Sequence, residues 1–225
     1  MIVWTLSFAT LVVGFSFVIG AAMSMILNKV KAKVSKIYRL IYILPWVIPS
    51  VLSLLMWNSF LADSGTINAM LGYRVPWLTN KWLARTAAVT VMVSISFPYY
   101  MLVALSFILA IPVEYFEAGK IEGAGSVKLF FKITLPILFN AMLPMLIMGF
   151  LLQFNQFGLY LLTYGEPKLK PGQPGATDLL ITYVFNLANN TKDYSLAAAY
   201  SVIIFIFMAL FAMVTMRINR NQKEF

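Results

Sequence analysis

Long uninterrupted apolar stretches dominate the pattern of positions along the chain. A helix needs about 20 mostly apolar residues to cross the hydrocarbon core of a bilayer, and five stretches meet that length without Lys, Arg, Asp or Glu in their interior. They cover residues 4–27, 40–61, 86–110, 135–163 and 196–216. The first has no basic segment before it and is too long for the apolar core of a signal peptide, so we expect a true span. The pattern therefore predicts an all-α polytopic membrane protein with five transmembrane helices.

The segments between these stretches differ in their content of Lys and Arg. Eleven of the 17 basic residues lie in residues 28–39, in the segment between the third and fourth stretches, and in the C-terminal tail. The loops on the other side hold Arg74, Lys81, Arg85, Lys168, Lys170 and Lys192. Because cytoplasmic loops carry the excess of positive charge, we expect the N-terminus outside the cell and the C-terminus in the cytoplasm. A first span that begins outside also indicates that one or more helices precede it, with Met1 an internal or alternative start.

The composition narrows the chemistry that is available to the chain. Hydrophobic residues make up 61% and charged residues 11%, with a mean hydropathy of +0.83, which is too apolar for a soluble domain. Cys and His are both absent, which excludes disulfides, thiolate and imidazole metal sites, and histidine-based triads. An enzyme is therefore the least favoured class. The net charge of +9 is explained by the topology signal and by attraction to anionic lipid, so no nucleic-acid partner is expected.

The cytoplasmic segment 111–136 combines two short helical patterns with a break between them. Acidic residues that include Glu117 lie toward the N-terminal end of the first pattern, where the helix dipole favours them. Gly123 and Gly125 interrupt the helix, and a second short helix is predicted over 126–134. On this pattern alone, the segment is either an amphipathic linker lying on the membrane or a helix that docks into a groove on a soluble partner.

The spacing of particular residues in this segment separates the two interpretations. Glu117-Ala118-Gly119 is followed by Gly123, then by Ile133 and by Leu135-Pro136. This spacing resembles the coupling loop of the membrane subunits of bacterial ABC importers, and the resemblance implies insertion into the cleft of an ATPase subunit. The family usually has Ala where Gly119 stands, a change that should loosen the helix by under about 1 kcal/mol without abolishing docking. The residues to which the resemblance assigns this role are Glu117, Ala118, Gly119, Gly123, Ala124, Phe130, Ile133 and Pro136.

Further segments extend the resemblance to nearly the whole chain. Residues 42–50, 97–99, 153–156, 177–180 and 196–199 are similar to the larger permease of maltose and maltodextrin importers. The resemblance implies a single transmembrane domain over 1–225 in the bacterial cell membrane, paired with a second related permease. It also implies two cytoplasmic ATPase subunits, which bind ATP and Mg²⁺, and an extracytoplasmic sugar-binding protein. No cofactor is expected in this chain itself, and ATP-driven closure of the ATPases would rock the permeases between inward and outward states.

The source of energy can also be argued from the residues. The chain contains no G-x-x-x-x-G-K-[ST] phosphate loop, so it does not bind ATP by that mechanism. The predicted spans lack the acidic residues that most ion-coupled carriers place at mid-membrane, and no internal repeats are evident. These absences disfavour a self-sufficient secondary carrier and leave a partner ATPase as the source of energy.

Polar groups inside the third and fourth apolar stretches mark a candidate substrate site. Such groups cost free energy in lipid and need a reason. Neutral amides can hydrogen-bond sugar hydroxyls, but they also join helices in bilayers, and the residues alone leave both interpretations open. The resemblance favours maltodextrin-type oligosaccharides, with another neutral sugar or polyol as the alternative. The predicted site residues are Ser96, Tyr99, Gly149, Leu152, Gln153, Asn155 and Gln156.

Overall fold

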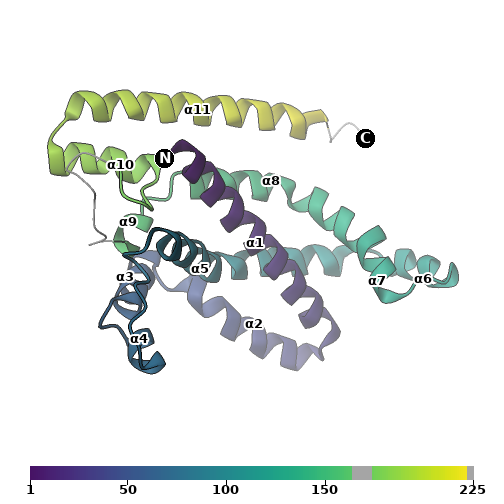
Figure 1. The fold of residues 1–225 in the computed structure, drawn as a ribbon. Coiled ribbons are helices and arrows are strands. Elements are labelled where there is room, and N and C mark those ends of the chain that lie inside the picture. The colour runs from purple at the N-terminus through teal and green to yellow at the C-terminus, as the bar shows by residue number, and fades with distance from the viewer. Residues whose placement is uncertain (164–173, 222–225) are drawn as a thin grey trace.

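The computed structural model describes residues 1–163 and 174–221, with side chains up to residue 215. Within those ranges the regular structure is entirely helical (Figure 1). The first half of the chain forms α1 (Ile2–Lys29), α2 (Ala32–Val47), α3 (Ser50–Leu61), α4 (Thr66–Leu71) and α5 (Lys81–Ala110). The second half forms α6 (Val113–Ile121), α7 (Ser126–Leu129), the π-helical turn η1 (Phe130–Thr134), α8 (Leu135–Phe154), α9 (Leu159–Leu162), α10 (Leu180–Asn186), the π-helical turn η2 (Leu187–Thr191) and α11 (Tyr194–Asn221).

The packing of α1 against α5 forms the centre of the fold. α1 also contacts α8, and α2 packs against α5. Phe8, Val12 and Met92 are almost fully buried in the core between the two central helices. Their backbones approach closely at Gly20, where a Cβ would lie 2.7 Å from the Met101 backbone nitrogen. Small residues at such contacts let membrane helices gain packing energy.

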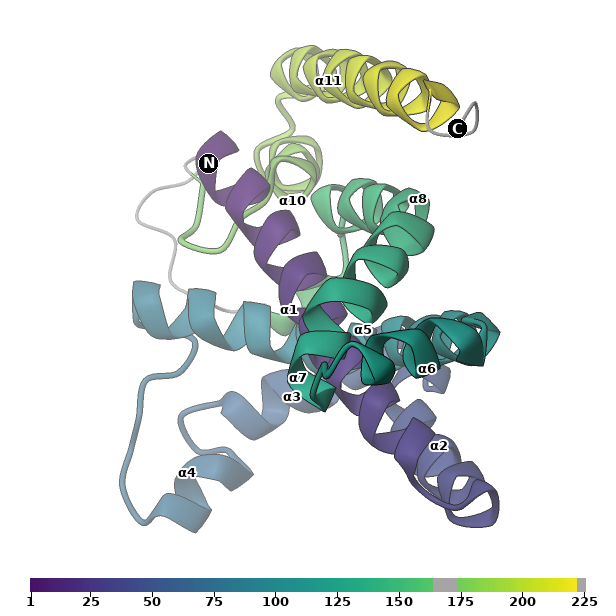
Figure 2. The same cartoon turned by 90° about the vertical axis from the view of Figure 1, so that its right-hand side faces the viewer.

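The five-span prediction is confirmed in number. Four helices in the described part of the chain are long and apolar enough to cross a membrane, and the pair of α2 with α3 and α4 makes a fifth when it is counted as one bent span. α11 lies apart from the α1–α5 pair and reaches the rest of the molecule through α10, η2 and α8 (Figure 2).

The second predicted span, 40–61, is broken rather than straight. α2 ends at Val47 and α3 begins at Ser50, with a bend of 85° at this break. Ile48 has an extended backbone (φ −66°, ψ 132°), because the residue before a proline is driven out of the helical region. Pro49 lacks the N–H that would continue the helix. The second predicted span is therefore two helices joined at a sharp bend, and Pro49 is the reason.

The helix observed for the fourth predicted span, 135–163, begins earlier and ends earlier than predicted. α8 ends at Phe154, and Asn155 leaves the helical region (φ −102°, ψ 31°). At its other end the helix is continuous from Ser126, so the short helix predicted over 126–134 runs into this span without a break. The π-helical turn η1 lies directly before Pro136. A wider turn accommodates a residue that cannot make the α-helical hydrogen bond.

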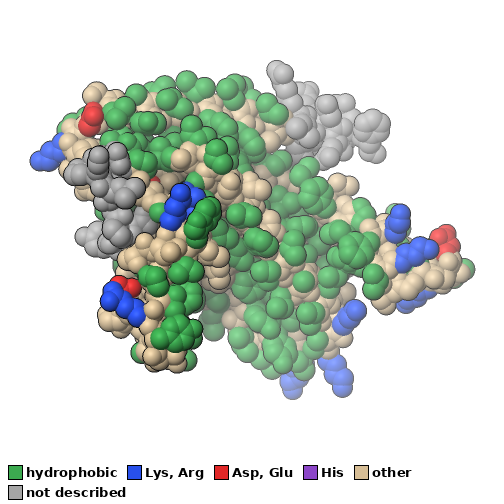
Figure 3. Space-filling view, in the orientation of Figure 1, with side chains coloured by type: hydrophobic (Ala, Val, Ile, Leu, Met, Phe, Trp, Pro, Cys, Tyr) green, Lys and Arg blue, Asp and Glu red, His purple; other side chains and the backbone are tan. Residues whose placement is uncertain are grey.

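The connecting segments gather at two ends of the molecule. The α1–α2 turn, α6, α7 and the end of α11 lie toward one end, and α4, α9 and α10 lie toward the other (Figure 1). Lys and Arg side chains are visible at both ends, with mainly hydrophobic side chains between them (Figure 3). The segments at each end are those that the basic residues assigned to one side of the membrane. Lys168, Lys170 and the basic residues of the C-terminal tail lie outside the described side chains.

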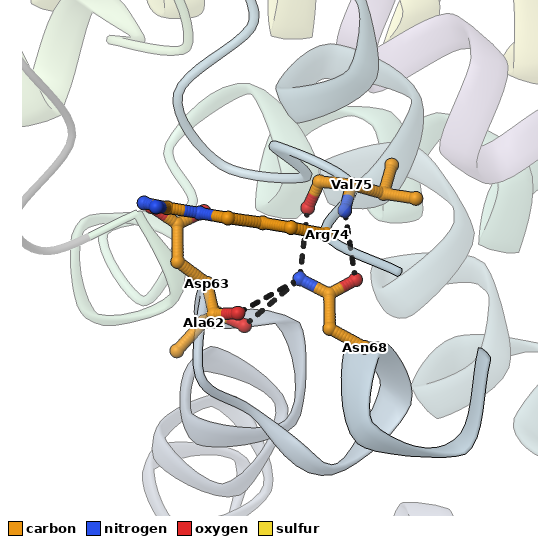
Figure 4. A network of polar contacts seen from close by, with 5 residues as sticks. All are labelled: Ala62, Asp63, Asn68, Arg74 and Val75. Atoms are coloured by element: carbon orange, nitrogen blue, oxygen red, sulfur yellow. Dashed lines mark hydrogen bonds and ion pairs between the residues drawn. The ribbon is translucent and has the colours of Figure 1, made fainter. Parts of the chain in front are cut away.

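A set of hydrogen bonds around Asn68 folds the loop after α3 (Figure 4). The buried Asn68 amide donates to the carbonyl oxygens of Asp63 at 3.1 Å and Val75 at 3.0 Å. Its Oδ1 accepts from the Val75 backbone nitrogen at 3.1 Å and from Trp77 Nε1 at 2.9 Å. Arg74 and Asp63 form an ion pair on the surface of the same loop. The loop is therefore held by its own polar groups.

A second polar network fixes α10 to α1. Thr5 Oγ1 accepts a hydrogen bond from the Leu180 backbone nitrogen at 3.1 Å, and Trp4 Nε1 donates to the Thr177 carbonyl oxygen at 3.1 Å. The buried Asp178 carboxylate accepts from the Thr182 hydroxyl at 2.9 Å. Segment 177–180 is thus the anchor of α10, a helix that begins after the gap in the described residues.

Candidate functional site

A cavity of about 320 Å³ lies where α2, α5 and α8 meet. Five of the seven residues predicted for the substrate site line it, and they come from the two helices that carry the polar groups of the third and fourth stretches. The structure therefore brings them together, while their role stays a prediction. The lining residues are Trp46, Ser96, Tyr99, Tyr100, Met145, Met148, Gly149, Leu152 and Gln153.

The polar centre of the cavity is the pair formed by Gln153 and Ser96. The Gln153 Nε2 donates to Ser96 Oγ at 3.2 Å and so connects α8 to α5. The Oε1 atom of the same amide is buried and has no hydrogen-bond partner among the described residues. A buried polar atom without a partner is unfavourable, and a ligand hydroxyl reaching this oxygen would satisfy it.

Aromatic rings form one wall of the cavity. Trp46 stacks on Tyr99 with ring centroids 5.9 Å apart, and Tyr99 meets Tyr100 edge to face at 5.3 Å. Trp46 and Tyr100 were not predicted as site residues. Trp46 lies between Pro45 and Pro49, and Pro49 is the signal in the sequence that the chain changes direction beside the cavity.

Gly149 forms the floor of the cavity beneath Tyr100. A Cβ at this position would clash with the Tyr100 hydroxyl, and its next neighbour would be the Tyr100 Cζ at 3.3 Å. Tyr100 is almost fully buried, so its ring has little room to move. Tyr100 can therefore take its position in the cavity wall only because Gly149 has no side chain.

Asn155 and Gln156 do not line the cavity. Both were predicted as site residues in the fourth span, but α8 ends at Phe154, before either of them. Gln156 Oε1 instead accepts a hydrogen bond from the Gly158 backbone nitrogen at 3.1 Å, and Asn155 is exposed. The apolar stretch that resumes at Leu159 hid this helix end in the sequence.

The predicted coupling segment projects from one end of the molecule as α6 and α7 (Figure 1). Gly123 adopts a left-handed backbone (φ +76°) between the two helices, which only glycine does readily. Glu117 and Ala118 are exposed on α6, and Ile121 is 88% exposed. The first of the two predicted coupling helices therefore presents an acidic and an apolar side chain to its surroundings.

The other predicted coupling residues lie along the same projection. Gly119 packs under Leu129 of α7, and a Cβ there would lie 2.5 Å from Leu129 Cδ2. The Leu129 side chain therefore occupies the space that the methyl group of the family's alanine would need. Ala124, Phe130 and Ile133 are half-buried, and Pro136 is exposed at the start of α8.

Comparisons with known proteins match nearly the whole chain. The model of the family described as "Binding-protein-dependent transport system inner membrane component" matches residues 7–223. The chain is 35% identical over 229 aligned residues to the maltose/maltodextrin transport system permease protein MalF of Klebsiella aerogenes, covering 97% of this chain and 45% of the relative. It is 34% identical to MalF of Escherichia coli K12 with the same coverage. The chain thus spans less than half the length of these relatives, which carry the names of transport permeases and not of enzymes.

Solved structures share the fold. A bacterial ABC transporter involved in the import of the acidic polysaccharide alginate aligns with a TM-score of 0.82 at 23% identity, over 98% of this chain and 78% of that one. An amino acid ABC transporter aligns with a TM-score of 0.64 at 18% identity, over 98% and 91%. At these identities the likeness concerns the fold alone.

Proposed function

The chain belongs to the family of binding-protein-dependent transport system inner membrane components, and from this premise we propose that it is the permease subunit of an ATP-driven importer of maltodextrin-type oligosaccharides. As a member of this family with several apolar helices, it is a multi-pass protein of the cell membrane. The single observation that carries the substrate assignment is the cavity between α2, α5 and α8, in which an amide, a hydroxyl and aromatic rings converge.

The chemistry of the cavity suits a neutral sugar. Sugar hydroxyls both donate and accept, and Gln153 with Ser96 offers matching donors and acceptors. The faces of Trp46 and Tyr99 supply flat apolar surface for the C–H face of a pyranose ring. The described lining contains no Lys or Arg, so an anionic sugar such as alginate would lack a counter-charge.

The cavity is open on one side, and we expect a second permease to complete it. Leu152 is 68% exposed, Met148 59% and Trp46 47%, so three lining residues are exposed at the surface of this chain. Apolar side chains with this exposure are suited to contact lipid or another membrane subunit. A pathway between two permeases would let substrate pass without crossing the interior of one helix bundle.

The projection formed by α6 and α7 is proposed to couple this chain to ATPase subunits that bind ATP and Mg²⁺. In this assignment Glu117 and its exposed neighbours face the cytoplasm, as the distribution of basic residues predicts. An extracytoplasmic sugar-binding protein would deliver substrate at the opposite end. Closure of the ATPases would then move α7 together with α8, because the helix is continuous from Ser126 to Phe154. α6 would follow through the packing of Gly119 against Leu129.

Another neutral solute, such as a different sugar or a polyol, is the alternative for the same cavity. The test is uptake of labelled maltotriose by the source cells with the gene intact, deleted and restored. We expect deletion to abolish uptake, and excess unlabelled maltodextrin to compete where alginate oligosaccharide and histidine do not. Uptake that survives deletion, or that only another solute competes for, would overturn the maltodextrin assignment.

A further inference from the structure

A second groove, of about 500 Å³, lies between the N-terminal halves of α1 and α5, away from the cavity described above. Its lining is mostly apolar, and several of its side chains are well exposed, with Val3 77%, Phe15 51% and Trp82 69% exposed. The lining residues are Met1, Val3, Trp4, Ser7, Leu11, Phe15, Trp82, Arg85, Thr86 and Val89.

One end of this groove carries positive charge. The Arg85 guanidinium lies 4.5 Å from the centroid of the Trp4 ring and 5.7 Å from that of Trp82, and Lys81 Nζ lies 5.6 Å from the Trp82 ring. Arg85 Nε donates to the Ala176 carbonyl oxygen at 2.8 Å. The Nη groups of Arg85 have no acceptor among the described residues.

The apolar part of the groove runs from this charged end into the span. Trp4 and Phe15 both line it and lie eleven residues apart on α1, a helical distance of about 16 Å. The hydrocarbon core is about 30 Å thick, so one leaflet is about half of that. The groove therefore has a cationic mouth and an apolar floor about as long as one leaflet is deep.

We propose that this groove binds one anionic phospholipid, with an acyl chain along α1 and α5 and the headgroup at Arg85 and Lys81. No acidic side chain lines the groove in the described part of the chain, so an anionic headgroup meets no repulsion there. The Trp4 and Trp82 rings hold the cations in place and are themselves suited to the headgroup level. The lipid would brace α1, α5 and the segment at Ala176 that Arg85 binds.

The test is photo-crosslinking in the protein purified from its own membrane with the subunits that accompany it. The probes are phosphatidylglycerol and phosphatidylcholine, each with a diazirine on the acyl chain. We expect the phosphatidylglycerol probe to label peptides within residues 1–15 and 82–89 about tenfold more than the phosphatidylcholine probe, since each basic residue near the surface strengthens binding to anionic lipid. Equal labelling by the two probes would overturn the proposal, as would labelling that avoids these peptides because protein fills the groove.

Variants separate the charge from the shape of the groove. R85Q should remove most of the excess of phosphatidylglycerol over phosphatidylcholine labelling, with Lys81 keeping the remainder, and R85K should keep most of the excess. S7F should block labelling by both probes, because the new ring fills the groove without altering its charge. R74Q is the matched control on the same side of the molecule and should label like the unchanged protein. Loss in R74Q equal to that in R85Q, or no loss in R85Q, would contradict the proposal.

Discussion

Two glycines on α1 differ in their surroundings, and together they test how closely α1 packs against α5. Gly20 lies against the α5 backbone, where a Cβ would be 2.7 Å from the Met101 nitrogen and 2.9 Å from the Tyr100 carbonyl carbon. Gly14 lies on the same helix with no atom within 4 Å of the position of a Cβ. The backbone at Met101 cannot move aside as a flexible side chain can.

Gly20→Ala should therefore push α1 away from α5 and destabilise the protein by about 1–3 kcal/mol. Gly14→Ala is the matched control and should be neutral or stabilising by up to about 1 kcal/mol, because alanine is the better helix former. Thermal unfolding of the two variants in detergent measures the difference. Equal melting temperatures would show that α1 and α5 are not in contact at Gly20.

The contact between Gly149 and Tyr100 allows a paired test in the cavity. Gly149→Ala should impair uptake, because the new methyl group would occupy the place of the Tyr100 hydroxyl. Adding Tyr100→Phe removes that hydroxyl and leaves Cζ at 3.3 Å from the Cβ, which is tight but tolerable. The double variant should therefore transport better than Gly149→Ala alone. If the second change brings no recovery, the floor of the cavity is not built as described.

At the scale of elements, the bend between α2 and α3 places an aromatic ring at the cavity. Pro49 stops α2, and the 85° bend leaves Trp46 near the end of α2, stacked on Tyr99 of α5. Pro45 lies inside α2 without breaking it. The two prolines therefore differ in effect although they are four residues apart in the same apolar stretch.

Pro49→Ala should permit α2 to continue, displace Trp46 and lower uptake by about tenfold or more, since small misplacements at a site can be this costly. Pro45→Ala should have little effect, because the bend does not depend on it. Uptake of labelled maltotriose, corrected for the amount of protein in the membrane, measures both. The same loss in both variants would indicate a general effect of proline on the span.

The α6–α7 projection makes a second prediction at this scale. Glu117→Ala should lower both uptake and sugar-stimulated ATP hydrolysis in the assembled transporter, because the side chain is exposed at the proposed contact with an ATPase. Glu114→Ala removes an exposed carboxylate one turn earlier on α6 and should leave coupling nearly intact. If ATP hydrolysis and uptake stay normal in Glu117→Ala, the projection does not couple through this residue.

For the whole molecule, the sequence was most informative about features that depend on residues close together in the chain. Uninterrupted apolar stretches predicted the spans, and Gly123 predicted the break between α6 and α7, because both follow from the residues themselves. The end of α8 at Phe154 was missed, although Asn155, Gln156 and Gly158 follow it, because the apolar stretch resumes at Leu159 and continues to Leu162. Trp46 was missed for a different reason: it reaches the cavity only through the tertiary bend at Pro49.

The most direct test of the account is the sugar dependence of uptake in Gln153→Ala against Gln156→Ala. Both changes remove an amide from the same stretch, but only Gln153 lines the cavity. Loss of one neutral hydrogen bond, about 0.5–1.5 kcal/mol, predicts a severalfold rise in the maltotriose concentration for half-maximal uptake in Gln153→Ala. Gln156→Ala should leave that concentration unchanged. Equal values in the two variants, or a rise only in Gln156→Ala, would contradict the placement of the sugar in this cavity.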